Sequence, residues 1–393
     1  MTSFLGVVVA VLGLGFLILA HEFGHFIVAK ATGMRVEEFS LGFGRYLVKK
    51  RVGETVYGIS ILPLGGYVRV TGMHKEEFEA RIAEAREEEA EWRAAHPEPD
   101  VDKRRPRDPE DRLAGPRALS ADEIAATPLE RRYYSHPFHH KVAFIVAGVV
   151  MNLIVAFFLI FIVGLSQGEY VVSTTVEQVQ PDTPAAAAGV QPGDRIVRLG
   201  DKEVSDWEAV RTEILTRPGE TVTLVVDRGG QEVELTAEIS ERDDGTGYLG
   251  IQPTAVHQNL GFFAALRYAA QETANMVKLI FSGLKMMFSG QVPVTGSQGL
   301  AGPVGIIQLS SEAFAGGYYL MLLALISVNL AILNMLPVLP LDGGHVLFSI
   351  IERIRGRSVS LRVFEQVSMV GLVIFVALFI LATSNDIGRI FGG

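Results

Sequence analysis

Four long apolar segments limit what this chain can fold into. They cover residues 4–31, 142–165, 318–336 and 363–382. Each has roughly the 20 mostly apolar residues that are needed to cross the hydrocarbon core of a bilayer. The first is close to a signal peptide in length, but it has no positive start and no Lys or Arg before Lys30. We therefore expect it to be retained and predict a polytopic α-helical membrane protein with four transmembrane helices.

Basic residues predict the orientation of these segments. They gather in the first loop (Lys49, Lys50, Arg51, Arg131, Arg132, Lys141) and in the last loop (Arg353, Arg355, Arg357, Arg362). The stretch after the second segment has none until Arg195. Because cytoplasmic loops near spans are enriched in Lys and Arg, the first and last loops should face the cytoplasm. The middle region and both termini should lie outside.

Composition excludes several classes of function. The net charge of -9 argues against nucleic acid as a partner, which requires a basic face. The chain has no cysteine, so disulfides and thiolate chemistry are excluded. Any bound metal must be held by His, Asp or Glu side chains.

Two histidines in the first apolar segment predict a metal site. In the run His21-Glu22-Phe23-Gly24-His25, the imidazoles are four residues apart, so a helix presents both on one face. Glu22 points about 100° away from His21 and is free to hold a metal-bound water and take its proton. Unpaired polar groups inside a span cost on the order of 3 kcal/mol each. Metal coordination offsets that cost, whereas a solvated His-Glu-His face is not available in lipid.

The predicted site needs a third protein ligand, as in most catalytic zinc sites. The string 334–345, NMLPVLPLDGGH, places Asp342 alone in an apolar run that is broken by prolines and followed by glycines. We expect Asp342 to complete the site, and His345 in the same loop is the alternative ligand. A turn-capping Asp is the structural alternative.

A small soluble domain is expected over residues 166–253. Alternating strand patterns at 171–179 and 221–227 flank short helices at 183–189 and 207–215, and a turn precedes a strand at 195–199. The string TPAAAAGVQPGDRIVRLGDKEV resembles a bacterial, circularly permuted PDZ domain, an α+β fold. In such domains an apolar-Gly-apolar loop receives a peptide carboxylate. Leu249, Gly250 and Ile251 match that pattern, with a plain strand and turn as the alternative.

Three other regions carry weaker patterns. Residues 56–71 predict a β-hairpin or looped strand with a turn at Gly65-Gly66. Residues 76–95 have a helical composition, while 96–127 are rich in Pro, Asp and Arg and are expected to be disordered or loosely attached. Residues 260–289 are amphipathic, which indicates helices on the outer membrane surface or, alternatively, a buried helix.

Together these motifs resemble the site-2 protease family of intramembrane zinc metalloproteases. The resemblance rests on HEFGH in the first span, LPLGGYV after it, the PDZ-like string, GPVG at 302–305 and NMLPVLPLDGGH, in that order. It is strongest to the bacterial RseP branch, which cleaves membrane-anchored anti-sigma factors, and this chain differs in having a single PDZ domain. The resemblance implies Zn²⁺ held by His21, His25 and Asp342, with Glu22 as general base. It also implies a multi-pass protein of the bacterial cell membrane.

The polar residues of the third span complete the expected site. Asn334 matches the family's asparagine, where an amide donor can stabilise the oxyanion. Asn329 either contacts the substrate backbone or packs between helices. The looped strand is expected to bind an unwound substrate by strand addition, because unwound backbone in an apolar setting needs hydrogen-bond partners. The residues assigned to this role are Ile59, Leu62, Gly65, Gly66 and Tyr67.

The predicted order of regions is as follows: 1–31 first span, 32–73 β-loop region, 74–130 charged and partly disordered cytoplasmic insert, 131–165 second span, 166–253 extracytoplasmic PDZ domain, 254–315 amphipathic helices and GPVG linker, 316–345 third span with the LDG motif, 346–362 basic loop, and 363–393 fourth span and tail.

The predicted function is zinc-dependent intramembrane hydrolysis of single-span membrane proteins such as anti-sigma factors, with remnant signal peptides as a second substrate class. The alternative is a PDZ-bearing membrane scaffold or chaperone with a structural zinc, and a C-terminal peptide is a possible ligand of the PDZ domain. A zinc transporter is disfavoured because residues 4–20 offer no polar groups to continue an ion path.

Overall fold

The computed structural model describes residues 4–95, 121–242, 244–290 and 302–391. The chain divides into two compact units. Unit 1 combines residues 1–162 with 267–393, and unit 2 covers residues 163–266. Each unit is described by itself.

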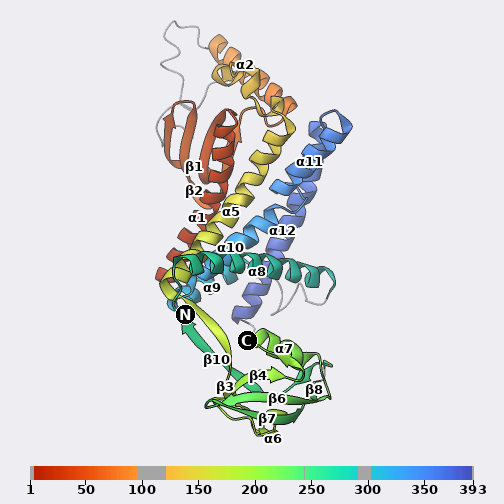
Figure 1. Cartoon of the computed structure of the whole chain (residues 1–393). Helices are drawn as coiled ribbons and strands as arrows, with labels where there is room; N and C mark the ends of the chain where they lie inside the picture. Colours follow the sequence, from red (N-terminus) through yellow and green to blue (C-terminus); the bar gives the residue numbers. More distant parts are fainter. Residues whose placement is uncertain (1–3, 96–120, 243, 291–301, 392–393) are drawn as a thin grey trace. The chain divides into compact units, whose positions relative to one another are not determined.

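Unit 1 is built mainly from helices (Figure 1). They are α1 (Phe4–Ala31), α2 (Lys75–Ala95), α4 (Ala121–Ala125), α5 (Phe138–Gln167), α8 (Phe262–Phe288), α9 (Pro303–Ala315), α10 (Tyr319–Asn334), α11 (Asp342–Arg355) and α12 (Leu361–Phe391). Short 3-10 turns, η1 (Leu129–Arg131) and η2 (Tyr133–Ser135), precede α5.

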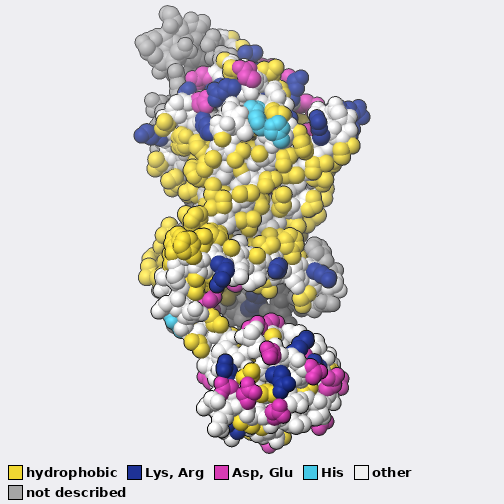
Figure 2. Space-filling view, in the orientation of Figure 1, with side chains coloured by type: hydrophobic (Ala, Val, Ile, Leu, Met, Phe, Trp, Pro, Cys, Tyr) yellow, Lys and Arg dark blue, Asp and Glu magenta, His cyan; other side chains and the backbone are white. Residues whose placement is uncertain are grey.

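Three helices of the described residues are long and apolar enough to cross a membrane. They are α1, α5 and α12, the last over Leu361–Arg389. On the face of unit 1 seen in Figure 2, hydrophobic side chains form a broad region below an end that is rich in charged side chains. The chain is therefore a membrane protein with at least three candidate spans.

The third predicted span is shorter than expected. Helix α10 has 16 residues, about 24 Å at 1.5 Å per residue, which is less than the hydrocarbon thickness. It ends at Asn334 because Pro337 and Pro340 cannot continue an α-helix. The chain then turns and begins α11 at Asp342. Non-helical backbone at such a place is tolerated where it is buried in protein, and Leu339 in this turn is 1% exposed.

Between α1 and α2 the chain forms a sheet from two long, bent strands, β1 (Val36–Val52) and β2 (Thr55–Val70). Their register joins four segments in the order 46–52, 55–60, 36–41 and 66–70. The expected strand at 56–70 is confirmed, and its Gly65 has a positive φ of 124°. The hairpin turn lies at Gly53, between β1 and β2, and not at Gly65-Gly66 as predicted. The reason is that both halves of β2 pair with β1, so they do not pair with each other.

The end of the predicted insert is ordered, which corrects part of the expectation for 96–127. Residues 96–120 lie outside the described residues, but Thr127 is 2% exposed. The Arg35 guanidinium donates to Thr127 Oγ1 at 2.6 Å and to the Glu123 carbonyl at 2.5 Å. These bonds fix the segment that leads into α5, although its composition is typical of solvated chain.

Two apolar clusters hold unit 1 together. One joins the end of α1 to the sheet and to the start of α5 through Met34, Val36, Val70, Tyr133, Phe144 and Ile145. The other joins α5, α8 and α10 through Ala156, Ile160, Ala269, Met276, Ala324 and Val328. Within the predicted amphipathic segment 260–289 the structure thus has a single helix, α8 (Phe262–Phe288), which crosses α5 and α10 (Figure 1). One side of it packs against them, while Leu279 and Phe281 on the other side are exposed.

Unit 2 is an α+β structure. Its sheet has the order β10-β3-β4-β6-β7, with β5 beside β4, and β8 pairs with β9. The strands are β3 (Glu169–Val179), β4 (Arg195–Leu199), β5 (Lys202–Glu203), β6 (Thr221–Arg228), β7 (Gln231–Glu238), β8 (Ser240–Glu241), β9 (Gly247–Tyr248) and β10 (Ile251–Gln258), and the helices are α6 (Pro184–Ala187) and α7 (Trp207–Leu215). Strand β10 continues past residue 253, so residues 254–258 belong to this sheet and not to the predicted linker.

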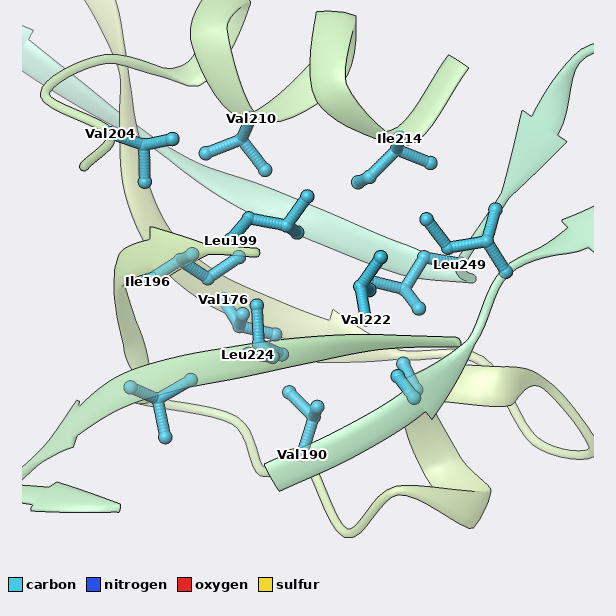
Figure 3. Close-up of a cluster of buried hydrophobic side chains, with 14 residues drawn as sticks. Val176, Val190, Ile196, Leu199, Val204, Val210, Ile214, Val222, Leu224 and Leu249 are labelled. Atoms are coloured by element: carbon cyan, nitrogen blue, oxygen red, sulfur yellow. The ribbon is translucent and has the colours of Figure 1, made fainter. Parts of the chain in front are cut away.

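The core of unit 2 lies between the sheet and α7 (Figure 3). Val210 and Ile214 on α7 point toward Leu199, Val222 and Leu249 from the strands and loops. Asp206 caps α7 by accepting a hydrogen bond from the Ala209 amide at 2.9 Å.

Candidate active site

Three side chains from separate parts of unit 1 converge on one point. The Nε2 atoms of His21 and His25 are 3.3 Å apart. Asp342 Oδ2 lies 3.1 Å from the His21 atom and 3.4 Å from the His25 atom. His21 and His25 come from the second half of α1, and Asp342 is the first residue of α11.

The spacing of these atoms suits a zinc ion. Zinc–nitrogen and zinc–oxygen bonds of about 2.0–2.1 Å at tetrahedral angles place neighbouring ligand atoms about 3.3 Å apart. Asp342 Oδ2 is buried and lacks a hydrogen-bond donor among the described residues. A buried carboxylate oxygen without a donor is costly unless a cation binds it. Among the described residues, these three are the one group of His, Asp and Glu side chains close enough to share a metal.

Helix α5 orients both imidazoles. His25 Nδ1 lies 2.8 Å from the Phe144 carbonyl oxygen, so it donates its proton there and leaves Nε2 as the lone pair for a metal. His21 Nδ1 lies 3.2 Å from the Asn152 amide nitrogen, while Asn152 Oδ1 is buried without a partner. Turning this amide by about 180° presents its oxygen to the His21 Nδ1 proton and satisfies both groups. We assign Asn152 that orientation.

Glycines let the helices approach closely enough. A Cβ at Gly148 on α5 would lie 2.5 Å from His25 Nε2 and 2.8 Å from His21 Nε2. A Cβ at Gly24 would lie 2.4 Å from the Ala147 carbonyl oxygen. Larger side chains at either position would therefore separate α1 from α5 or fill the site.

Glu22 lies beside the three converging side chains, at the edge of the sheet. The backbone amide of Val68 lies near its carboxylate. A Cβ at Gly66 would lie 2.9 Å from Glu22 Cγ, so this glycine makes room for the side chain. Segment 66–70 pairs with 36–41 along one edge, and its Gly66 packs against Glu22.

The polar residues of α10 differ in position. The Asn334 amide nitrogen lies 3.3 Å from His21 Nε2, so Asn334 borders the site as expected. Asn329 is exposed, and the structure therefore gives no support for a packing role between helices. His345, the alternative third ligand, turns away from the site: its ring lies 6.4 Å from that of His74 and 5.5 Å from that of Phe364.

The residues assigned to substrate binding fall in two places. In unit 1, Ile59 is half exposed, and the Tyr67 hydroxyl lies 2.6 Å from that of Tyr46. The side chain of Leu62 lies outside the described residues. In unit 2, Leu249 is a core residue at 1% exposure. Gly250 has a φ of 85°, and a Cβ there would lie 2.3 Å from that of Thr183.

Sequence reasoning missed the contribution of α5 to the site. Asn152 is the strongly polar residue of the apolar segment 142–165, and the sequence motifs assigned it no role. Asn152 is 0% exposed, and the Ser327 hydroxyl donates to its backbone carbonyl oxygen at 2.8 Å. A signal existed, because a lone amide in a span needs a partner. The sequence did not show which polar group that partner would be.

Two histidines and one carboxylate around a common point, with a further carboxylate beside them, define a hydrolytic metal site of the His₂-carboxylate class. The helices that carry it are those of a membrane protein. Over residues 9–378 the chain matches Peptidase family M50, and it belongs to that family. It is a zinc-dependent metalloendopeptidase.

Curated relatives extend over nearly the whole chain. A zinc metalloprotease RasP from Oceanobacillus iheyensis is 30% identical and covers 98% of this chain and 99% of its own. A putative zinc metalloprotease from Campylobacter jejuni is 32% identical over 97% of this chain and 93% of its own. The regulator of sigma-W protease RasP from Bacillus subtilis is 27% identical and covers 96% of this chain and 97% of its own.

The chain is also similar to solved structures of PDZ domains over part of its length. The PDZ domain of an SdrC-like protein from Listeria monocytogenes is 21% identical, with a TM-score of 0.20, and covers 21% of this chain and 87% of its own.

Proposed function

We propose that this protein hydrolyses peptide bonds of single-span membrane proteins at a zinc site within the membrane. The observation that carries the proposal is the convergence of His21, His25 and Asp342. Two of these ligands lie in the second half of α1, a helix long and apolar enough to span the bilayer.

Each polar group of the site has a role in amide hydrolysis. His21, His25 and Asp342 would hold the zinc ion, which supplies an activated water when bound. Glu22 takes the proton of the attacking water and delivers it to the departing amine. The Asn334 side chain donates a hydrogen bond to the oxyanion that forms from the substrate carbonyl. Asn152 and the Phe144 carbonyl keep the two imidazoles in the ligating tautomer.

Segment 66–70 is the expected docking edge for an unwound substrate. The close approach of Gly66 to Glu22, where a Cβ would lie 2.9 Å from Glu22 Cγ, supports placing this segment beside the site. An extended peptide added to the edge would satisfy its own backbone groups and pass the catalytic carboxylate. Ile59, Leu62, Gly65, Gly66 and Tyr67 shape this region, and the exposed Asn329 offers a further polar contact.

Substrates of the anti-sigma class are supported by the relative named for regulation of sigma-W. Remnant signal peptides are a second class with the same chemistry, namely a single apolar helix. We further propose a span over 316–345, formed by α10 and the first residues of α11. Both termini and unit 2 would lie outside the cell membrane, and the sheet and the end of α11 would lie toward the cytoplasm. Basic residues in the loops support this orientation. Unit 2 is proposed to be a PDZ domain that binds a peptide carboxylate at Leu249–Ile251.

The test is the substitution Glu22→Gln. It keeps the shape of the side chain and removes the base, so zinc content and folding should persist while cleavage of a single-span substrate falls by about 10²- to 10⁴-fold. Metal analysis and a cleavage assay in detergent measure both quantities.

The competing function is a membrane scaffold with a structural zinc. A closed structural site has four protein ligands and needs no unbound carboxylate beside it, whereas three ligands converge here. If wild-type protein binds zinc but leaves a panel of single-span substrates intact, the scaffold is the better description.

A further inference from the structure

A cavity of about 500 Å³ lies between α11 and the starts of α5 and α12. We refer to it as the α11 cavity. The residues that matter for its chemistry are His136, Lys141, Arg353, Arg357 and Glu352. Figure 2 shows histidine side chains next to basic ones at this end of unit 1.

Positive charge predominates in the lining. Four cationic side chains, Lys75, Lys141, Arg353 and Arg357, face two carboxylates, Glu76 and Glu352. Both carboxylates are engaged by the backbone that leads into α12. Glu352 Oε1 accepts from the Val359 amide at 2.9 Å, and Glu76 Oε2 accepts from the Leu361 amide at 3.0 Å. Glu352 also interacts electrostatically with Lys141, so the two carboxylates offset part of the positive charge and the four cations still outnumber them.

Several donors in the cavity are left without an anion. Within the described part of the chain, neither Arg353 nor Arg357 forms an ion pair. The Lys141 ammonium donates to the Tyr134 carbonyl at 2.9 Å and has two further protons to donate. His136 is 9% exposed, and its Nε2 atom has no hydrogen-bond partner. Unmatched donors of this kind are suited to an anionic ligand.

The α11 cavity adjoins a second cavity that lies next to segment 66–70. This second cavity, of about 440 Å³, runs along Tyr67–Val70 at the docking edge. Met73 and His74 line both cavities. His345, three residues after the zinc ligand Asp342, lines the α11 cavity from the other side. A peptide lying along the edge would therefore lead into it.

This continuity distinguishes a peptide from a lipid headgroup as the occupant. An extended chain advances about 3.4 Å per residue, so about four substrate residues would lie along segment 66–70. Roughly three more bring it past Met73 and His74. The residues that reach the cations thus lie about six to nine positions from the bond beside Glu22.

Resting on the proposed function, we propose that the α11 cavity is a specificity subsite for acidic side chains of the substrate. It would bind Asp or Glu in the stretch six to nine residues to the cytoplasmic side of the cleaved bond. The Arg353 and Arg357 guanidinium groups are suited to carboxylates because they pair with them in a bidentate manner.

The experiment compares single-span substrates that differ only in that stretch, carrying acidic, neutral or basic residues. Wild-type enzyme in detergent should cleave the acidic substrate with about tenfold higher kcat/KM than the neutral one, mainly through KM. In the variant Arg353→Glu/Arg357→Glu the preference should reverse toward the basic substrate. Arg355→Glu is the matched control, since Arg355 belongs to the same helix but does not line the cavity. It should keep the wild-type preference.

A second measurement separates failure of the subsite from failure of the proposed function. Fluorescent peptides with the acidic or neutral stretch are bound to Glu22→Gln enzyme, with and without the two Arg substitutions. Tighter binding of the acidic peptide that disappears with the substitutions supports the subsite even without turnover. Equal cleavage of all three substrates by wild type overturns it while upholding proteolysis. The proposal is also overturned if the two Arg substitutions change cleavage in proportion to the anionic lipid content and independently of substrate charge. That result would assign the cavity to a lipid phosphate.

Discussion

The two imidazoles of α1 depend on oxygen atoms of α5. The Phe144 carbonyl is a backbone atom and remains under any substitution, but the partner of His21 is the side chain of Asn152. This difference makes Asn152 the residue at which orientation of the site can be tested.

Replacing Asn152 by Leu removes the acceptor at nearly constant volume, so the His21 ring should lose its fixed tautomer. We expect zinc affinity to fall by about 10- to 100-fold, which titration with a competing chelator measures. Asn152→Asp keeps an oxygen acceptor and should restore most of the affinity. Ser327→Ala, which removes a hydrogen bond to the carbonyl of the same residue, is the control. Equal loss in the Asp and Leu variants would contradict a positioning role.

At the scale of elements, the sheet formed by β1 and β2 places a strand edge beside Glu22. Val68→Pro removes the amide at the middle of that edge. Cleavage should fall at least tenfold while zinc content stays constant, because no ligand is touched. Lys50→Pro, on the outer segment 46–52 of the same sheet, controls for general damage. Unchanged cleavage by the Val68 variant would count against docking at this edge.

An ion-pair cluster attaches the β1–β2 turn to α1 and η1. Arg131 donates two hydrogen bonds to Glu54, both at 2.8 Å, and Lys30 donates a third at 2.8 Å. These bonds lower the pKa of Glu54 to about 2, and the hydrogen bonds from Arg131 make the largest contribution. Since this pKa is depressed in the folded protein, the cluster stabilises it fully above the ordinary value of about 4.5.

The stabilisation by this cluster should therefore be lost as the pH falls from about 4.5 to 2. Glu54→Gln cannot titrate, so its Tm should lie below that of wild type at neutral pH and approach it in acid. Thermal unfolding in detergent at several pH values measures the difference. A constant difference across the range would show that Glu54 does not contribute through its charge.

At the scale of the whole molecule, the proposed orientation can be tested by cysteine labelling, because the chain has no cysteine of its own. Ser240→Cys in unit 2 and Ser358→Cys after α11 are both at exposed positions. A membrane-impermeant maleimide should label Ser240→Cys in intact cells and Ser358→Cys only after permeabilisation. Labelling of Ser358→Cys in intact cells would reverse the orientation.

Much of this protein follows from local sequence. Apolar length determined the candidate spans α1, α5 and α12, since a bilayer selects for hydrophobic runs wherever they occur. Helical periodicity placed His21 and His25 on one face, and a lone carboxylate after a proline break indicated Asp342. Alternation and turn residues indicated β4, β6 and α7 at nearly their observed bounds.

Only the tertiary structure decided the rest, because those features depend on contacts between distant segments. The four-segment order of the β1–β2 sheet, the partnership of Asn152 with His21 and the ordered residues around Thr127 each need a partner far away in sequence. The choice of Asp342 over His345 depended on which side chain the turn after α10 directs toward α1. Sequence periodicity fixes the face of an element, and packing alone fixes what that face meets.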